Sequence, residues 1–439
     1  MFPFRDIAVT LFAFGSIPYI FRNPYIGVLV WNVFAFLSPQ HYTWSFAYNF
    51  RFSLIVAVST ILSFFLYKGN KRIPWCGSVV LMAFLCIWVS ITTLSAVNPS
   101  GAIAELNRFY KIILLILIAL AVIDSREKLD RLIWVICVSL GFFGFKGGIF
   151  TIAHGGNYSI GGPPGSFFEG NNECAFALII FLPLLRYLHL NANKRLIKNG
   201  IALVMVLSVV AIIGSYSRGA FVAGAAMLCV LWLRSRKRLS LLLGMAILIP
   251  LMLNFMPEKW HARMNTIENF EQDPSAMGRI NAWHCAWNLA IDRPFFGGGA
   301  RAFTTQTFYR YAPDPENIHD VHSIYFEMLG EQGFVGLFLF LSLFFLSFLY
   351  TQQIRKMTRN STDYRWAYDL ASMCQVSFVG YAVGGAFLGL SYWDLPYTIV
   401  AIVVLTKTVI ESEAHVSTTE RQSTNPAISQ SSIQPKATT

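Results

Sequence analysis

Long apolar segments separated by short polar linkers follow one another along almost the whole chain. Most of them reach the minimum of about 17 residues that a helix needs to cross a bilayer. The first two are short and are separated by Arg22-Asn23-Pro24, so the pattern predicts roughly 12 or 13 spans. We therefore expect an all-α polytopic membrane protein with about 12 transmembrane helices. The segments lie near residues 6–21, 25–38, 51–67, 74–95, 109–123, 132–153, 173–189, 199–214, 219–233, 239–256, 322–350, 367–390 and 394–410.

One long polar interval interrupts this pattern, and it divides the chain into regions. We predict an N-terminal transmembrane helix bundle at 1–256 and a large, partly helical periplasmic catalytic loop at 257–321. C-terminal transmembrane helices follow at 322–410, and a disordered cytoplasmic tail at 411–439. The tail is rich in Ser, Thr and Gln, a composition typical of disorder.

Basic residues are concentrated in every second linker. Linkers rich in Lys and Arg stay on the cytoplasmic side of a membrane. The alternation therefore predicts a bacterial inner-membrane protein whose 257–321 loop faces the periplasm. With 13 spans the N-terminus would lie outside, and with 12 it would lie inside. The basic linkers contain Lys68, Lys71 and Arg72; Arg126, Lys128 and Arg131; Lys194, Arg195 and Lys198; Arg234, Arg236, Lys237 and Arg238; and Arg355, Lys356, Arg359 and Arg365.

The composition agrees with a membrane protein and argues against two other classes. Of the 439 residues, 55% are hydrophobic and 13% are charged, whereas soluble domains carry about 25% charged residues. The net charge of +11 does not indicate a nucleic-acid partner, because the basic residues form short clusters between apolar runs. Seven cysteines are scattered without metal-like spacing, so we interpret them as small core residues.

Two polar features lie at the predicted outer ends of spans. Lys146 begins Lys-Gly-Gly-Ile-Phe-Thr-Ile, and a Gly/Pro-rich stretch then leads to Asn172. Dense glycine lets the backbone approach a ligand or another helix, although a simple flexible connector would look the same. Arg218 follows Ser-Tyr-Ser at the start of a span. It is either a ligand-binding residue or an arginine that snorkels to the membrane surface.

Within the polar loop, residues 275–291 form a predicted amphipathic helix with Ser275 as its N-cap. Trp283 and Trp287 share one face of it, and Arg279 lies one turn before Trp283. The alternative is a basic, aromatic helix that only rests on lipid headgroups. Three glycines at 297–299 predict a mobile turn after this helix.

His322 is the candidate proton acceptor. Asp320 is a reasonable N-cap for the next helix, which would put His322 in its first turn. The positive end of a helix disfavours a charged imidazole, and a neutral histidine can take a proton from a hydroxyl. Tyr325 shares a helical face with His322 and is a further substrate contact. The His-x-x-His spacing beside Asp320 also permits a metal site, but no further ligand cluster supports it.

Arginines at separate outer-face positions indicate a ligand with more than one phosphate, because guanidinium groups bind phosphate bidentately and stay charged. Nucleotide sugars are confined to the cytoplasm, so a diphosphate at the outer face would be carried on a lipid. Transfer of a sugar from a lipid diphosphate requires stabilisation of the leaving charge and removal of a proton from the acceptor hydroxyl. Arginines and a histidine can supply both.

At these residues the chain resembles the O-antigen ligase/polymerase superfamily, and within it the branch of O-glycosylation ligases that accompany exosortase systems. The resemblance covers about residues 1–410. The matching motifs are Lys146-Gly-Gly-Ile-Phe-Thr-Ile, Gly-Pro-Pro-Gly-Ser-Phe-Phe-Glu-Gly-Asn-Asn ending at Asn172, Ser-Tyr-Ser-Arg218-Gly-Ala, Gly-Arg279-Ile-Asn-Ala-Trp283 and His322-Ser-Ile-Tyr325-Phe326-Glu-Met-Leu-Gly.

The resemblance implies a metal-independent, inverting glycosyltransferase without a cofactor, which acts in lipopolysaccharide biosynthesis in the cell envelope. It would move a finished glycan from undecaprenyl diphosphate to an acceptor hydroxyl, most typically on a lipid A-core sugar. By the same resemblance, Arg218 and Arg279 would bind the diphosphate and His322 would activate the acceptor. The family often has Asn after its histidine, whereas this chain has Ser323, which leaves the acceptor open.

Position and chemistry alone add Lys146, Asn172 and Arg301 as secondary binding candidates. A protein acceptor, which would make the chain a protein O-oligosaccharyltransferase, and a growing glycan, which would make it an O-antigen or exopolysaccharide polymerase, are alternative readings. A polysaccharide flippase or exporter belongs to a different class. It would need polar groups through the membrane depth, whereas polarity here gathers at one face.

Overall fold

The structure is a computed structural model that describes residues 4–234, 246, 250, 254–265 and 274–424. All regular structure in these ranges is helical, which confirms the predicted all-α class. The helices are α1 (Phe4–Arg22), α2 (Pro24–Phe36), η1 (Pro39–Tyr42), α3 (Phe52–Leu66), α4 (Gly77–Leu94), α5 (Pro99–Val122), α6 (Arg126–Ala153), α7 (Asn171–Asn191), α8 (Arg195–Gly214), α9 (Arg218–Arg234), α11 (Glu258–Asn265), α12 (Pro274–Asp292), α13 (Thr305–Tyr311), α14 (Ile324–Thr358), α15 (Arg365–Gly384), η3 (Gly385–Phe387) and α16 (Asp394–Thr424).

The apolar helices are those of a multi-pass membrane protein. By length and composition, eight helices in the described ranges can cross a membrane, and three shorter apolar helices, α2, α3 and the apolar part of α9, accompany them. The predicted segment at 239–256 lies largely outside the described residues. The total of about 12 spans therefore stays a prediction.

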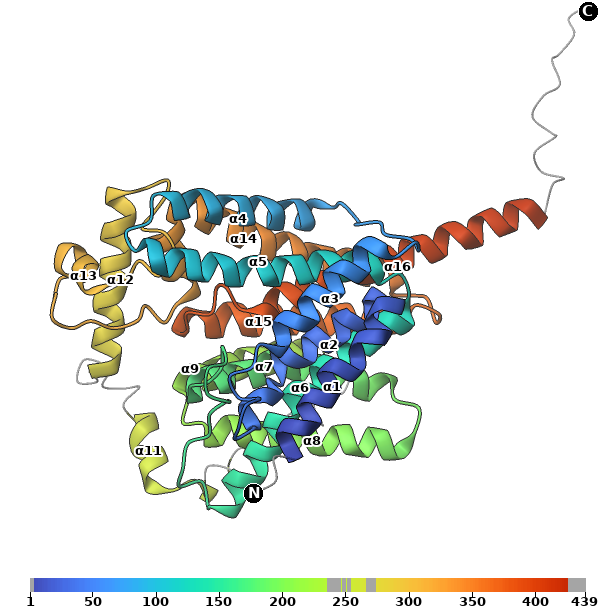
Figure 1. The fold of residues 1–439 in the computed structure, drawn as a ribbon. Coiled ribbons are helices and arrows are strands. Elements are labelled where there is room, and N and C mark those ends of the chain that lie inside the picture. The colour runs from blue at the N-terminus through green and yellow to red at the C-terminus, as the bar shows by residue number, and fades with distance from the viewer. Residues whose placement is uncertain (1–3, 235–245, 247–249, 251–253, 266–273, 425–439) are drawn as a thin grey trace, which may run out of the picture.

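The helices form one bundle with two different ends (Figure 1). Within it α6 packs along α8, α7 along α15, and α4 along α14. Helix α12 lies across one end of the bundle, which we call the α12 end. The linkers between α3 and α4 and between α7 and α8 lie at the opposite end, which we call the basic end, together with the far end of α16.

This arrangement agrees with the alternation of basic linkers along the sequence. The linkers that contain Lys68 and Lys194 lie at the basic end, away from α12. Which end faces which side of a membrane follows from the charge rule alone and stays a prediction.

Helix α16 extends further than the sequence pattern predicts. The apolar segment ends near residue 410, and we expected disorder from 411 onward. In the structure α16 continues to Thr424. Residues 425–439 of the predicted tail lie outside the described part of the chain.

The triple glycine after α12 is a close packing contact, in contrast to the mobile turn that we predicted. The amides of Gly298 and Gly299 donate to the carbonyls of Gly330 and Glu331 in α14, each at 2.8 Å. A Cβ atom at Gly297 would lie 2.6 Å from the Gly330 carbonyl oxygen, so a larger residue would force the two segments apart. These bonds fix the end of α12 to α14.

Candidate functional site

His322 lies just before α14, and its backbone is strained. The helix begins at Ile324, and Ser323 occupies the N-cap position. His322 therefore does not lie in the first helical turn, and Asp320 is not the N-cap, in contrast to the sequence prediction. The φ angle of His322 is +43°, a left-handed conformation that non-glycine residues adopt rarely and mainly at functional sites. The surrounding contacts must hold it in place.

Helix α12 provides those contacts through the segment 312–323, which we call the strap. The Trp283 indole N–H donates to the carbonyl of Val321 at 2.8 Å. Its ring also stacks on Phe326, with centroids 5.1 Å apart and planes 11° from parallel. Trp283 therefore contacts the chain both before and after His322, at Val321 and at Phe326. These contacts are with the protein, in contrast to the alternative interpretation of a helix that only rests on lipid headgroups.

Asn281 holds the earlier part of the strap. Its side-chain amide donates to the carbonyls of Asp314 at 2.7 Å and Asn317 at 3.0 Å. Its side-chain oxygen accepts from the Asp314 amide at 2.9 Å. Both donor hydrogens and the acceptor oxygen of this amide form hydrogen bonds to the strap, so the strap and α12 behave as one unit.

Arg279 lies on the same helix, beside the two histidines of the strap. A Cβ atom at Gly278 would lie 2.5 Å from the ring of His319, so only glycine lets that ring pack against α12. The buried Nδ1 of His319 has no hydrogen-bond partner among the described residues. Electrostatic interactions with Arg279 and His319 both lower the pKa of His322. Arg279 is thus close enough to His322 to act on it electrostatically.

The pKa of His322 is lowered from its ordinary value, chiefly because burial disfavours the charged imidazolium. The carboxylates of Asp320 and Glu173 oppose this effect, and the charge of Arg279 adds to it. The Asp320 carboxylate lies 3.8 Å from Nδ1 of His322. At neutral pH the imidazole is therefore uncharged and able to accept a proton.

Arg218 is the first residue of α9 and follows a second strained turn. Tyr216 has a φ angle of +61°, and its hydroxyl donates to the carbonyl of Gly156 at 2.6 Å. The side chain of Asn171 donates to the carbonyl of Ser215 at 2.7 Å. Arg218 is half-buried, and its turn is held by two segments from the Gly-rich region that the sequence singled out.

The short helix η3 lies between the Arg218 turn and the His322 strap. A Cβ atom at Gly219 would lie 3.1 Å from Phe387, and one at Gly385 would lie 2.4 Å from Ile324. Gly219 follows Arg218, and Ile324 begins the helix after His322. The residues that directly follow Arg218 and the strap therefore pack on the last and first residues of the same three-residue helix.

Sequence reasoning missed Glu173. It lies in the first turn of α7, and its negative charge raises the pKa of His322. It directly follows the Gly-rich motif, between Asn172 and a buried run of α7. The only available signal was a carboxylate at the start of an apolar span, which is costly unless it has a partner.

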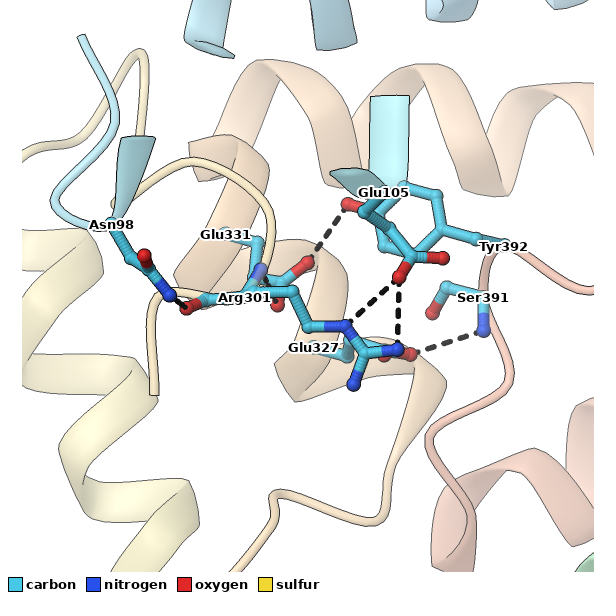
Figure 2. A network of polar contacts seen from close by, with 7 residues as sticks. All are labelled: Asn98, Glu105, Arg301, Glu327, Glu331, Ser391 and Tyr392. Atoms are coloured by element: carbon cyan, nitrogen blue, oxygen red, sulfur yellow. Dashed lines mark hydrogen bonds and ion pairs between the residues drawn. The ribbon is translucent and has the colours of Figure 1, made fainter. Parts of the chain in front are cut away.

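Arg301 has different partners (Figure 2). Its Nε and Nη2 atoms donate to one oxygen of Glu105 in α5, at 2.9 and 2.8 Å. Its φ angle is +58°, and its amide donates to the Glu331 side chain at 2.7 Å. The Asn98 side chain donates to its carbonyl at 3.1 Å. The guanidinium thus neutralises a buried carboxylate.

Two glutamates of α14, the buried Glu331 and the half-buried Glu327, complete this network, and the sequence pattern did not predict them. Glu331 accepts from the Tyr392 hydroxyl at 2.9 Å. Glu327 accepts from the Ser391 amide at 3.0 Å. Their four-residue spacing within an apolar helix was a usable signal, since ionisable residues in a span mark a functional or structural site.

The remaining candidates are Lys146, Asn172 and Tyr325. The Lys146 ammonium lies 5.1 Å from the centre of the Tyr42 ring, and Asn172 is half-buried in the first turn of α7. The Tyr325 hydroxyl donates to the carbonyl of Ala382 at 2.6 Å, next to η3. Within the described ranges, Lys146 forms no hydrogen bond or ion pair with His322. In those ranges, no group of three or more His, Cys, Asp or Glu residues is arranged to hold a metal ion.

Comparison with known families covers two stretches of the chain. Residues 203–341 match a family model described as O-antigen ligase, and this stretch contains Arg218, Arg279, Arg301 and His322. Residues 4–188 match a model described as a family of unknown function (DUF5935), which contains Lys146 and Asn172. No curated protein matches the chain.

Proposed function

The chain belongs to the O-antigen ligase superfamily, and from this premise we propose that it transfers a preassembled glycan from undecaprenyl diphosphate to an acceptor hydroxyl. The reaction would take place at the α12 end. The observation that carries the proposal is the clamped strap. It holds a neutral, strained His322 beside Arg279, with the Arg218 turn on the other side of η3.

Arg279 and Arg218 would hold the diphosphate of the donor. They come from different helices, α12 and α9, so two guanidinium groups can approach a diphosphate from separate directions. Each guanidinium can donate two parallel hydrogen bonds to phosphate oxygens and remains charged when partly desolvated. The buried Nδ1 of His319, which has no partner among the described residues, would gain one when a ligand is bound.

His322 would take the proton of the acceptor hydroxyl as its oxygen attacks the anomeric carbon. The new bond forms on the face opposite the diphosphate, so the configuration at that carbon is inverted. The bond from the anomeric carbon to the diphosphate oxygen breaks, and the leaving group keeps the electron pair and its negative charge. Arg279 and Arg218 would stabilise that charge as it develops.

The lipid carrier explains why the site lies at one end of a helix bundle. A lipid-linked diphosphate can reach the α12 end sideways from the membrane, while a hydroxyl arrives from the aqueous side. The charge alternation of the linkers favours the periplasmic side of the inner membrane for this end. We favour a lipid A-core sugar as the acceptor.

The decisive experiment is reconstitution of the purified full-length chain with an undecaprenyl-diphosphate glycan. Lipid A-core, a Ser/Thr-containing protein and a free glycan would be supplied as acceptors in parallel, and the labelled product identified by mass spectrometry. We expect transfer to lipid A-core, and we expect it to continue after metal ions are chelated. Labelling of the protein or elongation of the glycan would reassign the acceptor. Absence of transfer to all three, in the presence of folded protein, would overturn the proposal.

A further inference from the structure

A cavity with both charged and apolar lining residues lies at the basic end of the bundle, away from His322 and Arg279. It has a volume of about 360 Å³ and is bordered by α6, α7 and the start of α8. This volume is at the lower end of the range for small-molecule sites, which suits a headgroup better than a glycan. Its lining comprises Arg126, Asp130, Trp134, Tyr187, Leu188, Asn191, Ala192, Asn193, Lys194 and Ile197.

The charged groups of the cavity favour an anion. Two of its lining side chains are basic and one is acidic. The acidic one, Asp130, already accepts from the buried Tyr187 hydroxyl and lies 3.4 Å from Nε of Arg126. Lys194 is exposed at the N-cap position of α8, and it forms no ion pair within the described ranges. With two basic residues and one acidic residue in its lining, the cavity therefore keeps one net positive charge.

The apolar side of the cavity continues along the outside of the bundle. Trp134 lines the cavity and is 36% exposed. Val138 and Phe142 follow it at four-residue intervals on the same face of α6 and are also exposed. In a membrane-spanning bundle, exposed apolar side chains of this kind contact acyl chains. Ile197, from the start of α8, borders the cavity and is exposed as well.

We propose that this cavity binds the phosphate of an anionic membrane phospholipid. The phosphate lies between Arg126 and Lys194, and an acyl chain lies along Trp134, Val138 and Phe142. Basic pockets between transmembrane helices recognise anionic lipid headgroups in this way. The site is separate from the proposed transfer site and does not depend on it. Its occupant would tie α6, α7 and α8 together at the basic end.

The test measures lipid bound to the full-length protein in a neutral detergent by native mass spectrometry. Phosphatidylglycerol is titrated, and phosphatidylcholine serves as the comparison lipid with no net charge. Each Lys or Arg near a membrane surface contributes about 1 kcal/mol to binding of an anionic lipid, which corresponds to about a fivefold change in affinity. We therefore expect Lys194→Gln to weaken phosphatidylglycerol binding about fivefold, and Arg126→Gln with Lys194→Gln to weaken it about 30-fold.

Arg131→Gln is the matched control, because Arg131 lies on the same helix and at the same end but pairs with Glu127 outside the cavity. It should bind phosphatidylglycerol within about twofold of the unmodified protein. If the double variant unfolds, Lys194→Gln alone still tests the proposal. Within the described ranges the Lys194 side chain forms no ion pair whose loss would destabilise the protein.

Three results would overturn the proposal. One is unchanged phosphatidylglycerol binding by Lys194→Gln and by the folded double variant. Another is equal binding of phosphatidylcholine, which would show that the anionic charge is not recognised. The third is displacement of the lipid by millimolar glycerol 3-phosphate or inorganic phosphate, which would identify a soluble phosphate as the occupant.

Discussion

Arg279 and Arg301 flank the same short stretch of sequence, yet they lie in different surroundings. Arg279 comes from α12, and its charge lowers the pKa of the half-buried His322. Arg301 follows the triple glycine, and its guanidinium is 2.8–2.9 Å from the buried carboxylate of Glu105. One arginine acts on a titratable group at the candidate site. The other compensates an acid in the helix packing.

The comparison shows that the type of residue does not decide its role here. Both arginines lie in the polar loop, and both are followed by apolar and aromatic residues. What distinguishes Arg301 is its bond to Glu105, a carboxylate of α5 almost 200 residues earlier in the chain. A buried acid such as Glu105, 6% exposed, needs a positive partner, and Arg301 meets that need.

The largest expected effect is that of His322→Ala. Loss of a general base typically lowers a rate by about 10²- to 10⁴-fold, so we expect glycan transfer to fall by that factor while the protein stays folded. Transfer would be measured with purified protein and lipid-linked donor, and folding by thermal unfolding in detergent. His284→Ala is the matched control, because His284 is an exposed histidine on α12. Near-normal transfer by His322→Ala would show that His322 is not the general base.

The next effect separates the two arginines directly. In Arg279→Lys the charge is kept but the bidentate fork is lost, and we expect kcat/KM for the lipid-linked donor to fall about 10- to 100-fold. In Arg301→Lys the ammonium can still pair with Glu105, so we expect kcat/KM within about threefold of the unmodified protein. Equal losses in the two variants would contradict the distinction drawn here.

Arg301→Gln should reveal the structural role of that residue. Removal of the charge leaves Glu105 buried without its ion-pair partner, which costs on the order of 1–3 kcal/mol of unfolding free energy. Thermal or denaturant unfolding should therefore show a clear loss of stability, while transfer per folded molecule changes little. A stable Arg301→Gln protein with impaired transfer would instead indicate that Arg301 binds the substrate.

Trp283→Phe should have a smaller effect, because it removes one hydrogen bond and keeps a ring on Phe326. The lost bond to the Val321 carbonyl is worth about 0.5–1.5 kcal/mol, so we expect kcat to fall about 2- to 10-fold as His322 loses its fixed position. Limited proteolysis should cut the strap faster. Trp287→Phe is the control, since Trp287 is exposed and contacts Phe334 through its ring alone. Equal behaviour of the two variants would argue against the clamp.

The smallest expected effect is on the pH dependence of transfer. The folded pKa of His322 lies below its ordinary value, so kcat/KM should be at its plateau at neutral pH and fall as the pH drops through that lowered pKa. The carboxylate of Asp320 raises the pKa of His322. Asp320→Asn should therefore move the acid limb to lower pH, and Glu173→Gln should move it in the same direction. A shift to higher pH in either variant would contradict the assigned geometry.

Much of the secondary structure was predictable from local pattern. Ser275 was predicted as the N-cap of α12 but lies inside the helix, and the predicted range 275–291 differs by one residue at each end from Pro274–Asp292. The predicted end of α16, near residue 410, came too early because the polar residues that continue this helix lack an apolar pattern. The position of His322 was wrong because Asp320 resembles an N-cap. In the structure the helix begins four residues after Asp320. The side-chain oxygen of Asp320 accepts instead from the amide of the next residue, Val321, at 2.9 Å.

The sequence by itself determined a helical membrane protein, one large polar loop and the residue types of the candidate site. These follow from apolar length, charge alternation and motifs, which are local properties of the chain. Only the tertiary structure decided that Arg301 pairs with Glu105, that Glu173 lies near His322, and that η3 lies between the Arg218 turn and the strap. Each of these contacts joins segments far apart in sequence. They depend on how the helices pack, which residue spacing within one segment does not encode.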